Sequence, residues 1–167
     1  MKIIHLIGNS GSGKTHLITN MVKLLKEKLN FNVAVIKNIH EHEVDKPGKD
    51  SYKYSEAGAV FSITRNVNNE NTIFLKRDIK ITQLIEWLTR SPYKIDVIFI
   101  EGFKKLNYPS ILCISDMEEI KAQIDDSVKV ISGIICKKNT SKKQYINIPI
   151  LDIVKNFSEF LDIFEIR

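Results

Sequence analysis

The chain opens with the stretch Lys2-Ile3-Ile4-His5-Leu6-Ile7-Gly8-Asn9-Ser10-Gly11-Ser12-Gly13-Lys14-Thr15. Residues 2–7 form a nearly continuous apolar run, which is typical of a strand buried on both faces. After the glycines, apolar residues recur at helical spacing through Ile18, Val22, Leu25 and Leu29. A strand, a glycine-rich turn and an amphipathic helix in this order predict an α/β fold that begins with a phosphate-binding loop.

The glycine-rich turn matches the pattern G-x-x-x-x-G-K-[ST], and each part of it has a chemical use. Glycines let the backbone turn its N–H groups toward phosphate oxygens, and the following helix adds the positive end of its dipole. Lysine neutralises the β and γ phosphates, and the threonine hydroxyl is a ligand for magnesium. A turn with a chance lysine is the competing interpretation, which the flanking strand and helix disfavour. The candidate residues for a nucleoside triphosphate are Gly8, Asn9, Ser10, Gly11, Ser12, Gly13, Lys14 and Thr15.

A second candidate is Glu101, which ends the expected strand Asp96-Val97-Ile98-Phe99-Ile100. Ligands gather at the carboxyl ends of parallel strands, so this acid is expected to hold magnesium, directly or through water, or to orient an attacking water. We therefore predict Lys14 and Glu101 as the catalytic residues. A carboxylate that merely faces solvent is the alternative. Asp96, at the other end of the same strand, is predicted to be structural.

The polar segment over residues 37–51 is expected at the same edge of the sheet. It offers three lysines, two histidines and several carboxylates, and the candidates among them are Lys37, Lys49, His40, His42, Asp45 and Asp50. It fits a switch-like loop, with an aspartate near magnesium and a lysine on an anionic substrate, and equally a solvated charged loop. Zinc is disfavoured, because the histidine spacing is loose and no cysteine joins it.

The remaining pattern alternates strands and helices. An asparagine-rich turn between two β-like runs predicts a hairpin near residues 59–76, which extends the sheet edge or meets a second subunit. The other expected elements are strands at 33–36, 95–100, 110–115, 128–136 and 148–151, and helices at about 50–58, 84–88, 117–124 and 157–164. We predict one domain over residues 1–167, with a P-loop NTPase-like three-layer fold, a mainly parallel sheet and the inserted hairpin.

The composition excludes some classes of binding partner. The net charge of +5 comes from dispersed lysines without interleaved aromatics, which favours an anionic small molecule over nucleic acid. No apolar run is long enough to cross a membrane, and no signal segment is expected at Met1-Lys2. Cys113 and Cys136 are expected to be buried thiols in a reducing cytoplasm.

Three blocks, taken together, resemble the molybdopterin-guanine dinucleotide biosynthesis adapter family (MobB). The first is the phosphate loop at residues 8–15. The second is Val35-Ile36-Lys37, a histidine-rich stretch, Asp-Lys-Pro-Gly-Lys-Asp-Ser at residues 45–51, and Ala57-Gly58-Ala59. The third is Ile-Phe-Ile-Glu-Gly-Phe-Lys at residues 98–104. The likeness covers most of residues 1–110.

This resemblance implies a homodimeric protein that binds GTP and Mg²⁺ with at most slow hydrolysis. It implies work beside the enzyme that joins GMP to molybdopterin, with molybdopterin itself a further candidate partner. By position, phosphate and magnesium would fall to Gly13, Lys14 and Thr15, and Glu101 would lie on the magnesium side. By the same resemblance the facing loop would be lined by Lys37, His40, Asp45, Gly48, Lys49 and Asp50.

The chain departs from the pattern in two places. Asn38 stands where the family usually has histidine, and the histidine-rich stretch is about one residue short. The Asn/Thr-Lys-x-Asp base reader of GTPases is also missing, because Lys137-Lys138-Asn139-Thr140 lacks the aspartate. The choice of GTP over ATP therefore depends on the resemblance.

Two other functions remain open from the residues. One is a P-loop kinase for a small molecule or nucleotide that uses ATP, although such kinases close an arginine-bearing lid and this chain has four scattered arginines. The other is a nucleotide-dependent switch for a different partner.

Overall fold

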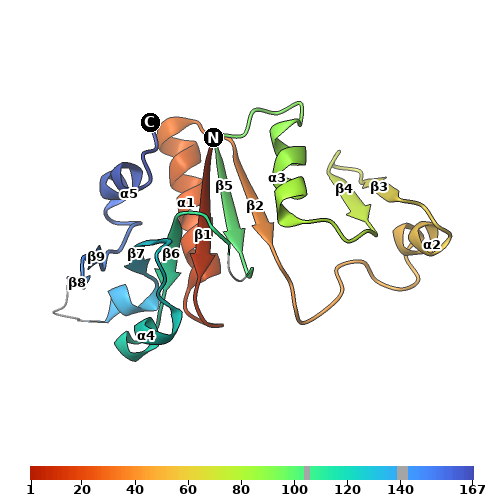
Figure 1. The fold of residues 1–167 in the computed structure, drawn as a ribbon. Helices are drawn as coiled ribbons and strands as arrows, with labels where there is room; N and C mark the ends of the chain where they lie inside the picture. Colours follow the sequence, from red (N-terminus) through yellow and green to blue (C-terminus); the bar gives the residue numbers. More distant parts are fainter. Residues whose placement is uncertain (104–105, 139–142) are drawn as a thin grey trace. The chain divides into compact units, whose positions relative to one another are not determined.

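Figure 1 shows the computed structural model, which describes residues 1–103, 106–138 and 143–167. The chain divides into two compact units, and each is described by itself. The sheet unit comprises residues 1–38 and 92–167, and the hairpin unit comprises residues 39–91. The single domain expected from the sequence stays a prediction.

The sheet unit is built on five parallel strands in the order β2-β5-β1-β6-β7 (Figure 1). The strands are β1 Lys2–Ile7, β2 Val33–Lys37, β5 Val97–Glu101, β6 Ser110–Cys113 and β7 Val128–Ser132. Apolar runs buried on both faces favour this arrangement over an antiparallel sheet with one wet face. Because all five strands run the same way, their carboxyl ends meet at one edge. The predicted α/β fold with a parallel sheet is confirmed.

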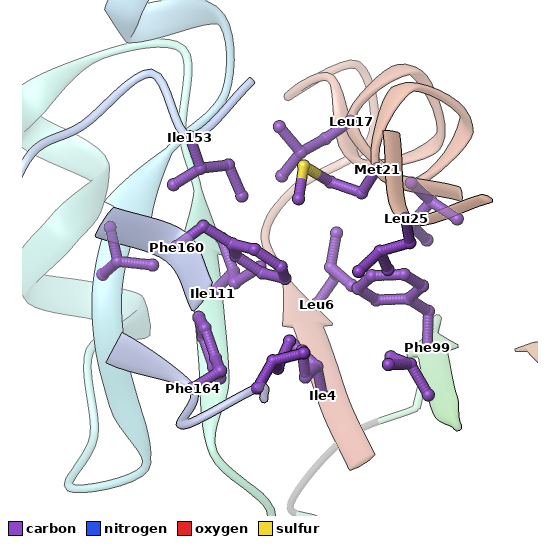
Figure 2. Close-up of a cluster of buried hydrophobic side chains, with 14 of the residues drawn as sticks. Ile4, Leu6, Leu17, Met21, Leu25, Phe99, Ile111, Ile153, Phe160 and Phe164 are labelled. Atoms are coloured by element: carbon purple, nitrogen blue, oxygen red, sulfur yellow. The ribbon is translucent and has the colours of Figure 1, made fainter. Parts of the chain in front are cut away.

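One face of the sheet is covered by α1 (Lys14–Leu29) and α5 (Phe157–Ile163). Figure 2 shows Leu17, Met21 and Leu25 of α1 in one buried cluster with Phe160 of α5 and with side chains of the strands. Phe157 and Phe160 of α5 stack with ring centroids 6.1 Å apart, and Phe164, just after the helix, is tilted against Phe160 at 5.2 Å. This core holds the helix that begins at the phosphate loop firmly against the sheet.

The opposite face carries a smaller core. Successive residues of a strand point to opposite faces, so Ile111 and Cys113 join the α1–α5 core while Leu112 and Ile114 face the other way. There they pack with the 3₁₀ helices η1 (Met117–Glu119) and η2 (Ile134–Lys137) and with α4 (Ile120–Gln123). Helices on both faces confirm the three-layer arrangement predicted from the sequence.

The strand expected over residues 128–136 is wrong in its second half. β7 ends at Ser132, because Gly133 has a φ of +97° and turns the chain into η2. A Cβ at Gly133 would lie 2.5 Å from the carbonyl oxygen of Ser12, so only glycine fits there. The turn brings η2 against the phosphate loop.

The sheet unit also contains a short hairpin of β8 (Gln144–Tyr145) and β9 (Ile148–Pro149). β9 falls within the strand expected at residues 148–151, whereas β8 and the pairing were missed. Past this hairpin, Ile150 bridges Ile131 of β7 in parallel, and the Leu151 N–H donates to the Ile131 carbonyl at 2.9 Å. The chain thus touches the edge of the sheet briefly and delivers residues 152–155 to the edge where the parallel strands end.

The hairpin unit contains α2 (Asp50–Glu56), β3 (Phe61–Arg65), β4 (Asn71–Leu75) and α3 (Ile81–Thr89). The predicted hairpin is confirmed, and its turn uses asparagine as expected. Asn69 has a φ of +62°, and the Asn66 side chain accepts from two backbone N–H groups. Within the described chain, β3 and β4 form a sheet of their own and do not extend the five-stranded sheet.

The two cysteines are free thiols. Cys113 lies in the core, where burial raises the pKa of its thiol to about 12, so it stays neutral. Cys136 is only half-buried, so the expectation of two buried thiols holds for Cys113 alone. Over the described ranges, no helix combines the length and apolar character needed to cross a bilayer.

Candidate functional site

The phosphate loop connects β1 to α1 at the edge where the parallel strands end. Gly8 has a φ of +140°, and a Cβ there would lie 2.1 Å from the carbonyl oxygen of Cys113. On its other side the loop is held by η2, since the Ile134 N–H donates to the Ser12 carbonyl at 3.2 Å. The glycine requirement inferred from the motif therefore has a concrete cause, which is close packing against two neighbouring segments.

The Lys14 side chain folds back over this loop. Its ammonium donates to the carbonyls of Gly8 at 2.8 Å and Asn9 at 2.7 Å, and it lies 3.4 Å from Ser12 Oγ. Phosphate oxygens are stronger acceptors for an ammonium than carbonyls are, because the bond is charge-assisted on both sides. The Lys14 ammonium is thus already positioned at the loop. Phosphate oxygens of a bound nucleotide would replace the two carbonyl oxygens as its hydrogen-bond acceptors.

Thr15, Lys37 and Glu101 form a compact trio beside the loop. Thr15 Oγ1 donates to Glu101 Oε1 at 3.0 Å and lies 3.3 Å from Oε2. The Lys37 ammonium lies 3.4 Å from Thr15 Oγ1 and 3.6 Å from Glu101 Oε1. The register explains the trio, because Lys37 of β2 and Leu6 of β1 both pair with Glu101 of β5. The sequence analysis named all three residues but not their direct contacts.

Two members of the trio, Thr15 and Glu101, also fit a magnesium ion, whereas the Lys37 ammonium is a cation and cannot be a ligand. Mg²⁺ prefers hard oxygen ligands at about 2.0–2.1 Å in octahedral geometry, which separates neighbouring ligands by about 3 Å. The Thr15 hydroxyl and the Glu101 carboxylate have this chemistry, and their oxygens are 3.0 Å apart. Among the residues that the structure describes, no group of three or more His, Cys, Asp or Glu side chains could hold a metal. A magnesium ion bound at a phosphate loop needs no such group, since phosphate oxygens and water molecules occupy its other coordination positions.

The other predicted site residues belong to the hairpin unit and are described within it. Asp45 is buried, and its Oδ1 accepts from Ser51 Oγ at 2.9 Å, while its Oδ2 has no hydrogen-bond partner among the described residues. Asp45 and Lys49 line an open cavity of about 420 Å³ together with Lys46 and Asp50. His40 is exposed on the preceding segment, and Gly48 has a φ of +91° in the turn before α2. The metal role of Asp45 stays a prediction.

Asp96 is structural, as the sequence analysis expected. Its carboxylate accepts from the Asn32 N–H at 2.9 Å and pairs with Lys94 at 3.1 Å, and these contacts lower its pKa. The basic run at residues 137–140 is described only as far as Lys138. Lys137 ends η2, and positions 139 and 140 lie outside the described residues.

His5 is a buried group that the motif analysis overlooked. It lies on β1, its Nε2 is 3.1 Å from the Phe103 carbonyl, and its Nδ1 has no partner among the described residues. Burial lowers the pKa of His5 from 6.5, although the Phe103 bond and the charge of Asp125 oppose this shift. The His5 imidazole is therefore harder to protonate in the folded protein than in the unfolded chain.

We accordingly predict that the free energy of unfolding falls as the pH drops below about 6.5, since the unfolded chain then binds more protons than the folded one. The slope should continue down to the lowered pKa of folded His5. His5→Gln should lack this part of the slope in denaturant titrations between pH 5 and 8, a range of about three units around the ordinary histidine pKa. The exposed control His16→Gln should keep it, and equal slopes in wild type and His5→Gln would contradict the assignment.

The comparisons with known proteins agree with this architecture. Residues 3–137 match the family described as MobB, molybdopterin guanine dinucleotide synthesis protein B. A Methanocaldococcus jannaschii protein, provisionally named as a molybdopterin-guanine dinucleotide biosynthesis adapter protein, is 36% identical over 150 residues. That match spans 78% of this chain and 61% of the relative's length. The Haemophilus influenzae protein of the same name is 31% identical and matches 78% of this chain and 73% of its own length.

Solved structures show the same fold. The crystal structure of Bacillus subtilis MobB superposes with a TM-score of 0.77 at 25% identity, covering 98% of both chains. A MobB homologue from Bacillus stearothermophilus gives a TM-score of 0.64 at 15% identity, covering 97% of this chain and 94% of its own. The second likeness concerns the fold alone.

Proposed function

The chain belongs to the MobB family, molybdopterin guanine dinucleotide synthesis protein B, and on that premise we propose that it is a GTP-binding adapter in molybdenum cofactor synthesis. In this role it assists the attachment of GMP to molybdopterin beside the enzyme that transfers the GMP. We also place the protein in the cytoplasm. The chain spans about 61% of the length of its relative from M. jannaschii, so the activity and partners are part of this proposal.

The observation that carries the nucleotide part is the Thr15–Lys37–Glu101 trio beside the glycine-rich loop. Loop N–H groups and Lys14 would hold the phosphates, while Thr15 and Glu101 would hold magnesium. Bound magnesium would neutralise phosphate charge and draw the phosphate chain toward the end of β5. Lys37 balances the charge of the buried Glu101 and is exposed enough to reach an anionic group as well.

Hydrolysis is expected to be slow. The sheet unit contains one arginine, Arg167 at the C-terminus, while Arg65, Arg77 and Arg90 belong to the hairpin unit. A P-loop GTPase without an arginine finger turns over at only about 10⁻⁴ to 10⁻³ per second. The same scarcity weighs against the kinase alternative, in which an arginine-bearing lid covers the transferred phosphate. An adapter that holds GTP needs no fast chemistry.

The hairpin unit supplies the argument for a homodimer. Residues directly opposite each other in an antiparallel pair point to the same face, so Phe61, Ile63, Ile73 and Leu75 share one face of the hairpin. Ser62, Thr64 and Phe74 share the other face, where Ser62 is buried and the contacts to α2 are made. The apolar face stays open, with Phe61 53% and Ile63 65% exposed. A second copy of the hairpin would cover this face.

We assign to the charged cavity of the hairpin unit the binding of an anionic substrate. Lys46 and Lys49 provide positive charge for an anionic group such as a phosphate of the pterin, and Asp45 offers a buried oxygen that has no hydrogen-bond partner among the described residues. His40 and Gly48 belong to the same segment, the former as a candidate contact and the latter as the turn that positions Lys49.

The proposal is tested by calorimetric titration of the full chain with GTP, ATP and their diphosphates, with and without magnesium. Wild type should prefer GTP, and magnesium should strengthen its binding. Thr15→Val keeps the shape of the side chain but removes the hydroxyl, so it should lose most of the gain from magnesium, about 10-fold or more in affinity. Binding without magnesium should change little.

Thr19→Val is the matched control, one turn later on the same helix. Its hydroxyl donates only to the Thr15 carbonyl, so magnesium should strengthen binding as in wild type. Absence of nucleotide binding by the folded wild type would end the proposal. A clear preference for ATP would replace it with the kinase.

A further inference from the structure

A cavity of about 330 Å³ adjoins the phosphate loop, within the range of about 300–1,000 Å³ that small-molecule sites occupy. It is lined on one side by Gly13, His16 and Asn20 at the start of α1, and on another by the turn after β7. The third wall comes from residues 152–155. Gly13 and His16 flank Lys14 and Thr15, which would hold the phosphates. The cavity therefore lies directly beside the place where a phosphate chain would bind.

The third wall is rigidly placed. Its Ile153 is fully buried in the α1–α5 core, and Figure 2 shows this side chain beside Leu17 and Met21. The preceding residues are tied to β7 by the Ile131–Ile150 bridge and by the Leu151 hydrogen bond. Asp152 is therefore delivered to the cavity at the edge where the parallel strands end, which is where ligands bind in open α/β sheets.

Asp152 is the one acidic residue among those that line the described cavity. About a quarter of its side chain is exposed, its Oδ1 receives the Lys155 N–H at a long 3.4 Å, and its Oδ2 is 3.7 Å from the Lys155 ammonium. These long contacts leave acceptor capacity on both oxygens. Leu17, Ile134 and Val154 provide apolar walls against which a planar ring can lie.

The carboxylate of Asp152 can distinguish one nucleobase from another by its hydrogen bonds. Guanine presents two adjacent donors, the ring N1–H and the exocyclic 2-amino group, and a carboxylate accepts both at once. Adenine presents a donor beside an acceptor on the corresponding edge, and it would leave one carboxylate oxygen facing a lone pair. Resting on the proposed function, we propose that this cavity is the base subsite and that Asp152 reads guanine. Asp152 thereby takes the place of the aspartate that is missing after Lys137-Lys138.

The test is an exchange of base preference. Asp152→Asn keeps an oxygen for the ring N1–H and for the Lys155 N–H, but its amide now donates where the carboxylate accepted. Xanthine carries a carbonyl in place of the 2-amino group of guanine, so it complements this amide. Calorimetry with the magnesium complexes of GDP, XDP and ADP should show wild type preferring GDP. In Asp152→Asn, GDP should weaken by at least about 10-fold and XDP should become the preferred ligand.

Asp162→Asn is the matched control, since this exposed aspartate lies on α5 and is not among the residues that line the cavity. It should retain the wild-type order of the three nucleotides. GDP binding with an unchanged GDP-to-XDP ratio in Asp152→Asn would overturn the base subsite while leaving the phosphate loop and the proposed function intact. Wild type that binds none of the nucleotides would overturn both proposals together.

Discussion

Lys14→Ala should weaken the binding of magnesium GTP by at least about 100-fold, which corresponds to about 2.7 kcal/mol. The expected loss is large because the ammonium makes charge-assisted hydrogen bonds to the β and γ phosphates, and alanine leaves those charges to the magnesium ion and the backbone N–H groups alone. The fold should survive, since the ammonium hydrogen-bonds to oxygens of the loop and Lys14 is not among the buried core residues of the described chain. Calorimetry of the folded variant measures the affinity, and any slow GTP hydrolysis should disappear with it.

Lys23→Ala is the control for this loss. It removes the same charge from the same helix at an exposed position, where the lysine is 3.9 Å from Glu27. Its affinity for GTP should stay within about two-fold of wild type, because a distant exposed charge is screened by solvent and salt. Lys14→Ala that binds GTP as wild type does would contradict the assigned role. Wild-type hydrolysis at tens of turnovers per second without a partner would contradict the expectation of slow turnover.

The second large effect is expected on assembly, where Ile63→Asp should convert the proposed homodimer into a monomer. Ile63 stands at the centre of the open apolar face of the hairpin, opposite Ile73. A carboxylate there would be buried without a partner in the interface, and a buried unpaired charge costs several kcal/mol. The dissociation constant should therefore rise by more than about 100-fold. Sedimentation equilibrium over a range of protein concentrations measures it.

Thr72→Asp introduces the same charge on the same hairpin but on the face opposite Ile63 and Ile73, since neighbouring strand residues alternate. Its side chain is already exposed, so the dimer should persist. A wild type that sediments as a monomer at micromolar concentration would remove the homodimer from the proposal. A dimeric Ile63→Asp would move the interface elsewhere.

Local patterns were reliable where one physical requirement dominates. Residues 2–15 predicted β1, the loop and the start of α1, because a doubly buried strand, a glycine-rich loop and an amphipathic helix each leave a distinct signature. The asparagine-rich turn of the hairpin was predicted for the same reason. The limit of β7 was missed, because Gly133 is required by a contact with Ser12, far away in the sequence.

The sequence by itself therefore determined the fold class, the phosphate loop and the candidates Lys14, Thr15 and Glu101, since these follow from short-range patterns with a chemical reason. Only the tertiary structure decided which side chains meet. The parallel register sets Lys37 and Glu101 beside Thr15, and a single bridge to β7 carries Asp152 to the cavity next to the loop. Asp152 has no motif around it, because its position depends on strand order and core packing rather than on its neighbours in the chain.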